Sequence, residues 1–129
     1  MSGIYVHFPY CEHRCIYCDF ALTTPRAIPA DRFTDAVLRE IELRRAPRAV
    51  RTFYVGGGTP SLWPVDQLAR VIERFEVAGE VTLEANPEQC DAAWIRSVQA
   101  LGVNRISLGV QSLDSQELTL LMRKHGVEG

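Results

Sequence analysis

Residues 51–75 read RTFYVGGGTPSLWPVDQLARVIERF, which is a strand, a glycine turn and a helix in direct succession. Residues 51–55 are the expected strand, and it ends where three glycines begin. Pro64 is a favoured first-turn residue, and the helix after it places Leu68 and Ile72 on one apolar face. The stretch therefore predicts one strand–helix unit of an α/β protein.

The same pattern recurs on both sides of this unit. Further strands are expected at residues 3–8, 80–85 and 104–110, and further helices at residues 31–46, at 91–101 and from 115 onward. Repeated strand–helix units predict an α/β fold with a parallel sheet and right-handed crossovers, either an open wound sheet or a barrel. A full (β/α)₈ barrel takes about 250 residues. The whole chain, residues 1–129, is therefore expected to be one incomplete domain with about four βα units.

Local signals mark the ends of several elements. The third strand is expected to stop at Asn86-Pro87, because the residue before proline avoids the helical region. The third helix is expected to stop at Gly102 and to turn four apolar residues inward, Trp94, Ile95, Val98 and Leu101. Residues 114–117, DSQE, resemble a capping box that opens the last helix. That helix is expected to continue through residues 121–122 and to end at Gly126.

Composition and charge narrow the possible partners. The chain is 47% hydrophobic and 23% charged, with a formal net charge of −2. Nucleic acids and anionic membranes select a basic face, so neither is expected as a partner. No apolar run reaches the roughly 20 residues of a membrane helix, and the start lacks the basic and apolar regions of a signal peptide. We therefore expect a cytoplasmic protein with reduced thiols.

Three cysteines, Cys11, Cys15 and Cys18, follow the first predicted strand with C-x₃-C-x₂-C spacing. Reduced thiols packed this closely indicate metal ligation rather than disulfides. A 4Fe–4S cluster normally takes four thiolates, so three in one loop leave one iron open to an exogenous ligand. The amino and carboxylate groups of S-adenosylmethionine (SAM) suit that iron. An electron passed from the cluster to the sulfonium then cleaves a C–S bond and yields a 5′-deoxyadenosyl radical.

A structural zinc site is the alternative, with His7 or His13 as the fourth ligand of a tetrahedral ion. Zinc sites usually present two separated ligand pairs, whereas all three thiols here sit in one loop, and this spacing favours the cluster. His7 is expected to be a hydrogen-bonded structural residue. Cys90 lies far away in the sequence and is expected to be a small buried residue rather than a ligand.

Five motifs in order along the chain carry a family resemblance. They are YVHFPYCEHRCIYC at residues 5–18, VGGGTPS at 55–61, TLEANP at 82–87, RISLGVQS at 105–112 and LMRKH at 121–125. They closely resemble the radical SAM family that contains oxygen-independent coproporphyrinogen III oxidase and the HemW-type haem chaperone. The resemblance covers nearly the whole chain. It implies that residues 1–129 are the N-terminal portion of a radical SAM core, which is a partial TIM-like barrel.

The resemblance assigns the three cysteines to the cluster and a further set of residues to SAM. That set is Tyr5, Gly57, Gly58, Thr59, Glu84, Gln111 and Arg123. Glycines allow close backbone approach. Glu84 can accept hydrogen bonds from ribose hydroxyls or the SAM ammonium, Gln111 can donate and accept, and Arg123 can fix a carboxylate bidentately. Each of these residues, taken singly, also has a purely structural explanation. The glycine segment could be a tight turn, Glu84 a solvated strand end, Gln111 a loop amide and Arg123 a helix-terminal charge. Tyr5 could be packed in the core.

Phe20 distinguishes between the members of this family. The coproporphyrinogen III oxidases carry an additional cysteine two residues after the third ligand, where this chain has Phe20. The departure favours a HemW-type haem chaperone, for which the resemblance implies haem, an electron donor protein and haem-acceptor proteins as partners. The haem determinants lie outside this chain. The alternative is an enzyme of porphyrin biosynthesis that decarboxylates coproporphyrinogen III to protoporphyrinogen IX. Tyr17, between two ligands, is expected to cover the cluster.

Overall fold

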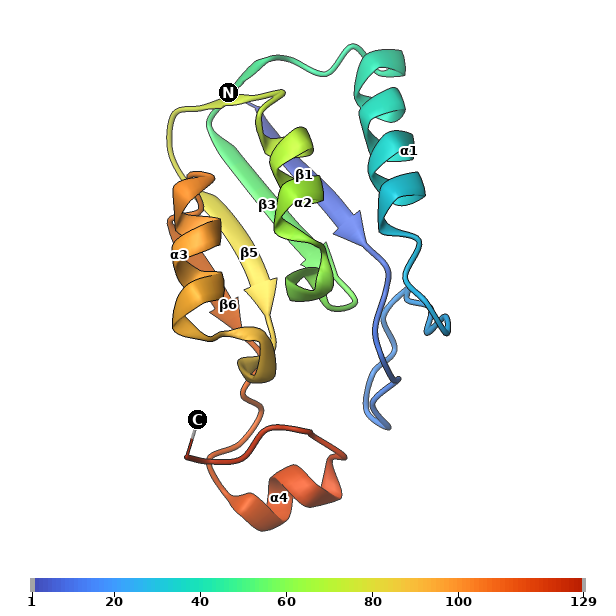
Figure 1. Ribbon diagram of the computed structural model, residues 1–129, viewed down its shortest axis with the longest axis vertical. Coiled ribbons are helices and arrows are strands. Elements are labelled where there is room, and N and C mark those ends of the chain that lie inside the picture. The colour runs from blue at the N-terminus through green and yellow to red at the C-terminus, as the bar shows by residue number, and fades with distance from the viewer. Residues whose placement is uncertain (1, 129) are drawn as a thin grey trace.

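Figure 1 shows the computed structural model, which describes residues 2–128. Its main sheet has four strands, β1 (Gly3–Phe8), β3 (Thr52–Gly57), β5 (Val81–Ala85) and β6 (Arg105–Leu108). Neighbouring strands are parallel, and their order across the sheet is their order along the chain. A wound sheet reverses this order at a switch point, whereas a barrel adds each strand on the same side. The sheet is therefore the first part of a barrel.

Three helices cover one face of the sheet, α1 (Ala30–Leu43), α2 (Val65–Ile72) and α3 (Ala92–Ala100). Short 3-10 turns, η1 (Pro60–Leu62) and η2 (Pro87–Gln89), follow β3 and β5. A fourth helix, α4 (Ser115–Leu120), lies beyond the carboxyl ends of the strands (Figure 1). A second, two-stranded parallel sheet, β2 (Ala49–Val50) with β4 (Glu76–Val77), was not predicted. None of the helices described in residues 2–128 has the length and apolar character for crossing a membrane.

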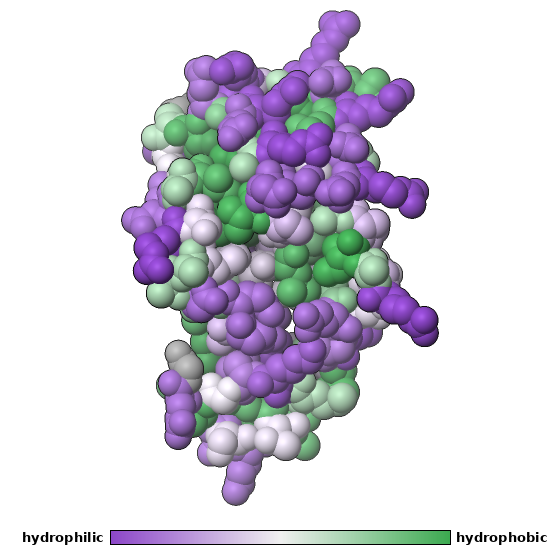
Figure 2. Space-filling view, in the orientation of Figure 1, coloured by the Kyte–Doolittle hydropathy of each residue, from purple (hydrophilic) through white to green (hydrophobic). Residues whose placement is uncertain are grey.

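The core lies between the sheet and its helical layer. Successive strand residues point to opposite faces, so Val6 and Phe8 are buried against the helices while Tyr5 and His7 point to the other face. Trp63 is fully buried and stacks on Phe8 with the ring centroids 5.2 Å apart. Hydrophilic side chains project from the outer surface of the helical layer in Figure 2, because an amphipathic helix turns only one stripe inward.

The ends of two helices test the predicted stop signals. Gly102 follows α3 with a φ of 99°, as predicted for a C-terminal glycine. The last helix, in contrast, ends at Leu120 rather than at Gly126, so the prediction for residues 121–122 is wrong. The cause is Met122, which adopts a φ of 57° and turns the chain out of the helix.

Two further side-chain predictions are wrong in part. The Asp114 carboxylate does accept hydrogen bonds at the start of α4, but Glu117 does not complete the capping box. The Glu117 carboxylate accepts instead from the Ser112 hydroxyl at 2.5 Å. Ile95 was expected to be buried and is 43% exposed, because Val98 occupies the buried position of α3.

One hydrogen bond inside the core joins α1 to the segment after β3. The Trp63 indole N–H donates to the Thr34 hydroxyl at 3.0 Å, and that hydroxyl donates to the Ala30 carbonyl at 2.8 Å. Both side chains are fully buried. A buried donor that loses its partner costs about 1–3 kcal/mol, because no water replaces the lost bond.

We predict that Thr34→Val lowers the free energy of unfolding of the intact protein by about 1–3 kcal/mol, because valine leaves the Trp63 N–H without an acceptor. Thr119→Val is the matched control. The Thr119 hydroxyl also donates to the carbonyl four residues earlier but is exposed, so its loss should change stability by less than about 0.5 kcal/mol. Urea unfolding followed by far-UV circular dichroism measures both variants, and equal effects would contradict this role of Thr34.

Candidate functional site

A cavity of about 330 Å³ lies at the carboxyl ends of the strands. Parallel α/β proteins bind their ligands at this edge. The wall of the cavity comes from the loop after β1, from the last residues of β3, β5 and β6 and the residues that follow them, and from the segment after α4. It includes the predicted site residues other than Tyr5, namely Cys11, Cys15, Cys18, Gly57, Gly58, Thr59, Glu84, Gln111 and Arg123. The fold thus brings together residues that are distant in the sequence.

The cysteine loop (residues 9–29) is joined to the end of β3 by backbone hydrogen bonds. The Gly58 N–H donates to the Phe8 carbonyl at 2.7 Å, and the Thr59 N–H donates to the Tyr10 carbonyl at 2.8 Å. These bonds continue the pairing of β1 with β3 beyond the last paired residues of the sheet. The start of the cysteine loop is therefore fixed by the main chain and not by side chains alone.

Contacts within the cysteine loop hold its two limbs together. Tyr10 and Thr23 form an isolated parallel bridge. The Arg14 guanidinium donates to the Cys18 carbonyl at 3.3 Å and to the Leu22 carbonyl at 3.1 Å. Arg14 was not predicted to matter, and its role depends on the folded path of the loop.

The two glycines predicted to contact SAM lie where the surrounding atoms leave no room for a side chain. Gly57 has a φ of 117°, in the left-handed region, and a Cβ there would lie 2.6 Å from the Phe8 carbonyl oxygen. A Cβ on Gly58 would lie 2.7 Å from the Tyr10 carbonyl oxygen and 3.0 Å from the Cys11 Sγ. The glycine segment is therefore the end of β3 packed closely against the cysteine loop, and it also faces the cavity.

The three cysteines face the cavity from different environments. Cys11 is buried, and burial raises the pKa of its thiol. Its Sγ lies 3.1 Å from the Thr59 hydroxyl oxygen. Cys15 and Cys18 are half-buried. Three thiols around one cavity fit a 4Fe–4S cluster, in which each thiolate binds a different iron.

The zinc alternative needs a tighter grouping of ligands. Within residues 2–128, no three His, Cys, Asp or Glu side chains are gathered so that they could hold a single metal ion. His7 has both ring nitrogens engaged, because Nε2 donates to the Ala21 carbonyl at 2.6 Å and Nδ1 accepts from the Tyr5 hydroxyl at 2.9 Å. His7 is thus a hydrogen-bonded structural residue, as predicted. His13 Nε2 lies 3.8 Å from the Cys15 Sγ.

Glu84 is oriented by a tyrosine that the sequence analysis did not single out. The Tyr54 hydroxyl donates to the Glu84 Oε1 at 2.6 Å. This hydrogen bond, followed by burial, raises the pKa of Tyr54. Glu84 is therefore a half-buried, oriented carboxylate on the cavity wall and not a solvated strand end.

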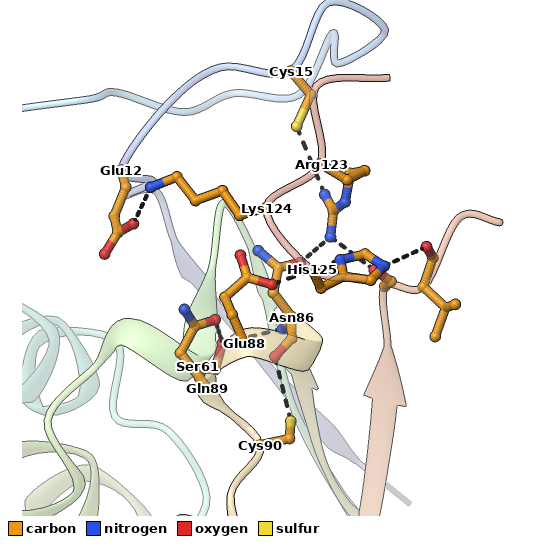
Figure 3. A network of polar contacts seen from close by, with 12 residues as sticks. Glu12, Cys15, Ser61, Asn86, Glu88, Gln89, Cys90, Arg123, Lys124 and His125 are labelled. Atoms are coloured by element: carbon orange, nitrogen blue, oxygen red, sulfur yellow. Dashed lines mark hydrogen bonds and ion pairs between the residues drawn. The ribbon is translucent and has the colours of Figure 1, made fainter. Parts of the chain in front are cut away.

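Arg123 enters the cavity from the segment after α4 (Figure 3). Its Nη1 donates to the Tyr17 hydroxyl at 3.0 Å and to the Cys15 Sγ at 3.7 Å. Its Nη2 donates to the Asn86 Oδ1 at 2.8 Å and to the Gly109 carbonyl at 2.7 Å. Its Nε–H is buried and has no partner among the described residues. Arg123 is thus more than a solvated helix-terminal charge, and its free donor suits an anionic group in the cavity.

A Schellman turn brings Arg123 to this position. The Arg123 N–H donates to the Leu118 carbonyl at 2.9 Å, and the Met122 N–H donates to the Thr119 carbonyl at 3.0 Å. Gln111, before α4, also has a left-handed backbone, with a φ of 69°. Non-glycine residues seldom adopt this region, and such strain is often found at functional sites.

Tyr5 and Asn86 depart from their expected places. Tyr5 does not line the cavity, and core packing is also wrong for it, since it is 59% exposed on the open face of the sheet. Asn86 was predicted only as a strand stop, but its side chain accepts from Arg123 and its N–H donates to the Ser61 hydroxyl at 3.2 Å. Its place directly after a strand at the ligand-binding edge was the signal that could have identified it.

The fold and the site together define a class of protein: a partial parallel barrel with a three-cysteine loop and an anion-compatible cavity at its carboxyl edge. The Radical SAM superfamily model matches residues 5–129. The chain therefore belongs to the radical SAM superfamily.

Several relatives are similar to nearly all of the chain. It is 41% identical to Radical S-adenosyl methionine domain-containing protein 1, mitochondrial, from Bos taurus, over 96% of the chain and 30% of that protein. It is 36% identical to the heme chaperone HemW of Escherichia coli, over 96% of the chain and 35% of that protein. The structure of the E. coli coproporphyrinogen III oxidase HemN matches with a TM-score of 0.85 and 31% identity, over 98% of this chain and 31% of that one. The chain spans about one third of the length of these relatives.

We predict that Gly58→Ala lowers the iron and sulfide content of the anaerobically reconstituted intact protein several-fold, because the added methyl group meets a main-chain carbonyl and the Cys11 sulfur. Gly126→Ala is the control, since nothing lies within 4 Å of a Cβ at that position. Iron and sulfide analysis of both variants makes the test. Unchanged iron in Gly58→Ala would refute the close packing of the cysteine loop on β3.

Proposed function

We propose that this chain is the part of a HemW-type haem chaperone that binds a 4Fe–4S cluster and SAM. Cys11, Cys15 and Cys18 would hold the cluster and leave one iron for SAM. When bound, the two groups supply radical chemistry, and the protein positions and shields them. The observation that carries the proposal is that the three cysteines and all the predicted SAM residues except Tyr5 line one cavity.

The proposed SAM contacts differ in chemical role. Gly57, Gly58 and Thr59 would offer a close main-chain surface, while Gln111 would donate or accept at the cavity edge. Glu84 would accept from SAM hydroxyl or ammonium groups. Its Oε1 is already fixed by Tyr54.

Arg123 and Tyr5 complete the proposed SAM contacts. The unpartnered Nε–H of Arg123 would donate to the SAM carboxylate, since its Nη groups already have protein acceptors. Tyr5 is proposed as a contact from the open sheet face, because its ring and the Glu84 carboxylate both lie 3.1 Å from the position of a Cβ on Gly56.

The chaperone is favoured over the oxidase by the residue at position 20. Phe20 lines the cavity and is 66% exposed, where the oxidases of the family have their additional cysteine. Among the relatives, heme chaperones HemW from Mycobacterium tuberculosis and E. coli are 40% and 36% identical to the chain. We therefore propose haem, an electron donor protein and haem-acceptor proteins as partners of the whole protein, and a cytoplasmic location. The alternative function is coproporphyrinogen III oxidation.

We predict that Cys15→Ser abolishes cluster assembly in the intact protein, because two remaining thiolates do not hold a 4Fe–4S cluster. Cys90→Ser is the matched control. Cys90 lies outside the cavity lining, and its thiol donates to the Asn86 carbonyl at 3.4 Å. Iron, sulfide and the visible charge-transfer absorption are measured after anaerobic reconstitution. Retention of that absorption by Cys15→Ser would assign the ligand role to another residue.

A second prediction separates the chaperone from the oxidase. Incubated anaerobically with SAM, a reductant and coproporphyrinogen III, the intact wild-type protein and its Phe20→Cys variant are both expected to form no vinyl product. The reason is that one cysteine does not supply the substrate contacts of an oxidase. The wild type is also expected to bind haem in an absorption titration. Protoporphyrinogen IX from the wild type would establish the oxidase instead, and product from the Phe20→Cys variant alone would refute the argument about that residue.

A further inference from the structure

Arg123 is the one described side chain whose guanidinium bonds both to the cysteine loop and to the ends of two strands. The bonds run to Tyr17 and Cys15 in the cysteine loop, to Asn86 after β5 and to Gly109 after β6. Figure 3 shows the guanidinium between Cys15 and Asn86. The planar fork of arginine suits such multiple acceptors, whereas the ammonium of lysine is a single point.

Two of the three predicted cluster ligands, Cys11 and Cys15, have different polar neighbours. Cys11 faces the neutral hydroxyl of Thr59 at 3.1 Å. Cys15 faces the Arg123 guanidinium, a permanent cation, at 3.7 Å. Its other polar neighbours are the His13 ring at 3.8 Å and the Tyr17 hydroxyl, which is neutral and also accepts from Arg123. An N–H donor and a positive charge beside a ligand thiolate stabilise the reduced cluster, which carries the additional electron, so they raise the reduction potential.

We propose that Arg123 is a positioning residue that holds the cysteine loop against the ends of β5 and β6, and that its bond to Cys15 raises the reduction potential of the cluster. The inference rests on the proposed function, because it requires a cluster on Cys15. It adds a second role for Arg123 beside the SAM contact, and the two roles use different nitrogens of the guanidinium.

Lys124 provides a closely matched control. It is adjacent to Arg123, carries the same charge and also ties the cysteine loop, through an ion pair of 2.6 Å between Lys124 Nζ and Glu12 Oε2. That pair is half-exposed at the surface and is not bonded to sulfur, and such pairs contribute little. Arg123→Met and Lys124→Met therefore remove the same charge from the same segment, but only the first removes a donor to Cys15.

The test measures cluster content and midpoint potential in the intact, anaerobically reconstituted protein without SAM. Iron and sulfide analysis gives the content, and an EPR-monitored redox titration gives the potential. We expect Arg123→Met to shift the reduction equilibrium about tenfold toward the oxidised cluster, which is 59 mV for a one-electron couple. Arg123→Lys should lie between that variant and the wild type, and Lys124→Met should match the wild type.

The outcomes separate the inference from the proposed function. A wild type that assembles no cluster would overturn the proposed function itself. A cluster of unchanged content and potential in Arg123→Met and Arg123→Lys, or equal shifts in Arg123→Met and Lys124→Met, would overturn the inference and leave the proposed function standing. Loss of the cluster from Arg123→Met alone, with a shifted potential in Arg123→Lys and an unchanged circular dichroism spectrum, would support it.

Discussion

The close approach between the cysteine loop and the glycine segment at the end of β3 is the constraint on which the site depends. The N–H groups of Gly58 and Thr59 reach the carbonyls of Phe8 and Tyr10 only because no Cβ stands between the two main chains. The same approach brings Cys11 against Thr59 and into the cavity wall. Because these glycines have no side chain, the start of the cysteine loop can hydrogen-bond to the chain after β3. The positions of the thiols are therefore set by the strands of the sheet.

The alternation of side chains along the strands separates the core from the site. Val55 and Leu83 are buried beneath the helices, whereas Tyr54 and Glu84, their neighbours in sequence, meet on the opposite face. Because the period of a strand is two residues, a slip of one residue would exchange these roles. The correct register therefore both buries the apolar side chains under the helices and places the polar side chains on the face of the site.

Short-range pattern was enough to predict the four strands of the main sheet and the four α-helices but not the short β2–β4 sheet, and ordered motifs were enough to predict most of the cavity wall. Strand periodicity placed β1 and β5 correctly, since it depends on neighbouring residues, but β3 runs on through Gly56 and Gly57 instead of ending where the glycines begin. The end of α4 was wrong because a left-handed Met122 has no compositional signal, unlike Gly102. The contacts of Arg14, Tyr54 and Asn86 could not be derived either. They join segments whose proximity is set by the packing of loops, and no spacing rule describes that packing.

The left-handed turn after α4 needs compensation, and the contacts of Arg123 supply it. Met122 costs about 1–2 kcal/mol in this backbone region. A hydrogen bond made by a charged group contributes about 1.5–3 kcal/mol, and the Arg123 guanidinium makes several, two of them to strand ends. The turn that carries Arg123 into the cavity is therefore held by the contacts it makes there. The position of this segment therefore depends on the acceptors that the two Nη groups meet in the cysteine loop and at the strand ends.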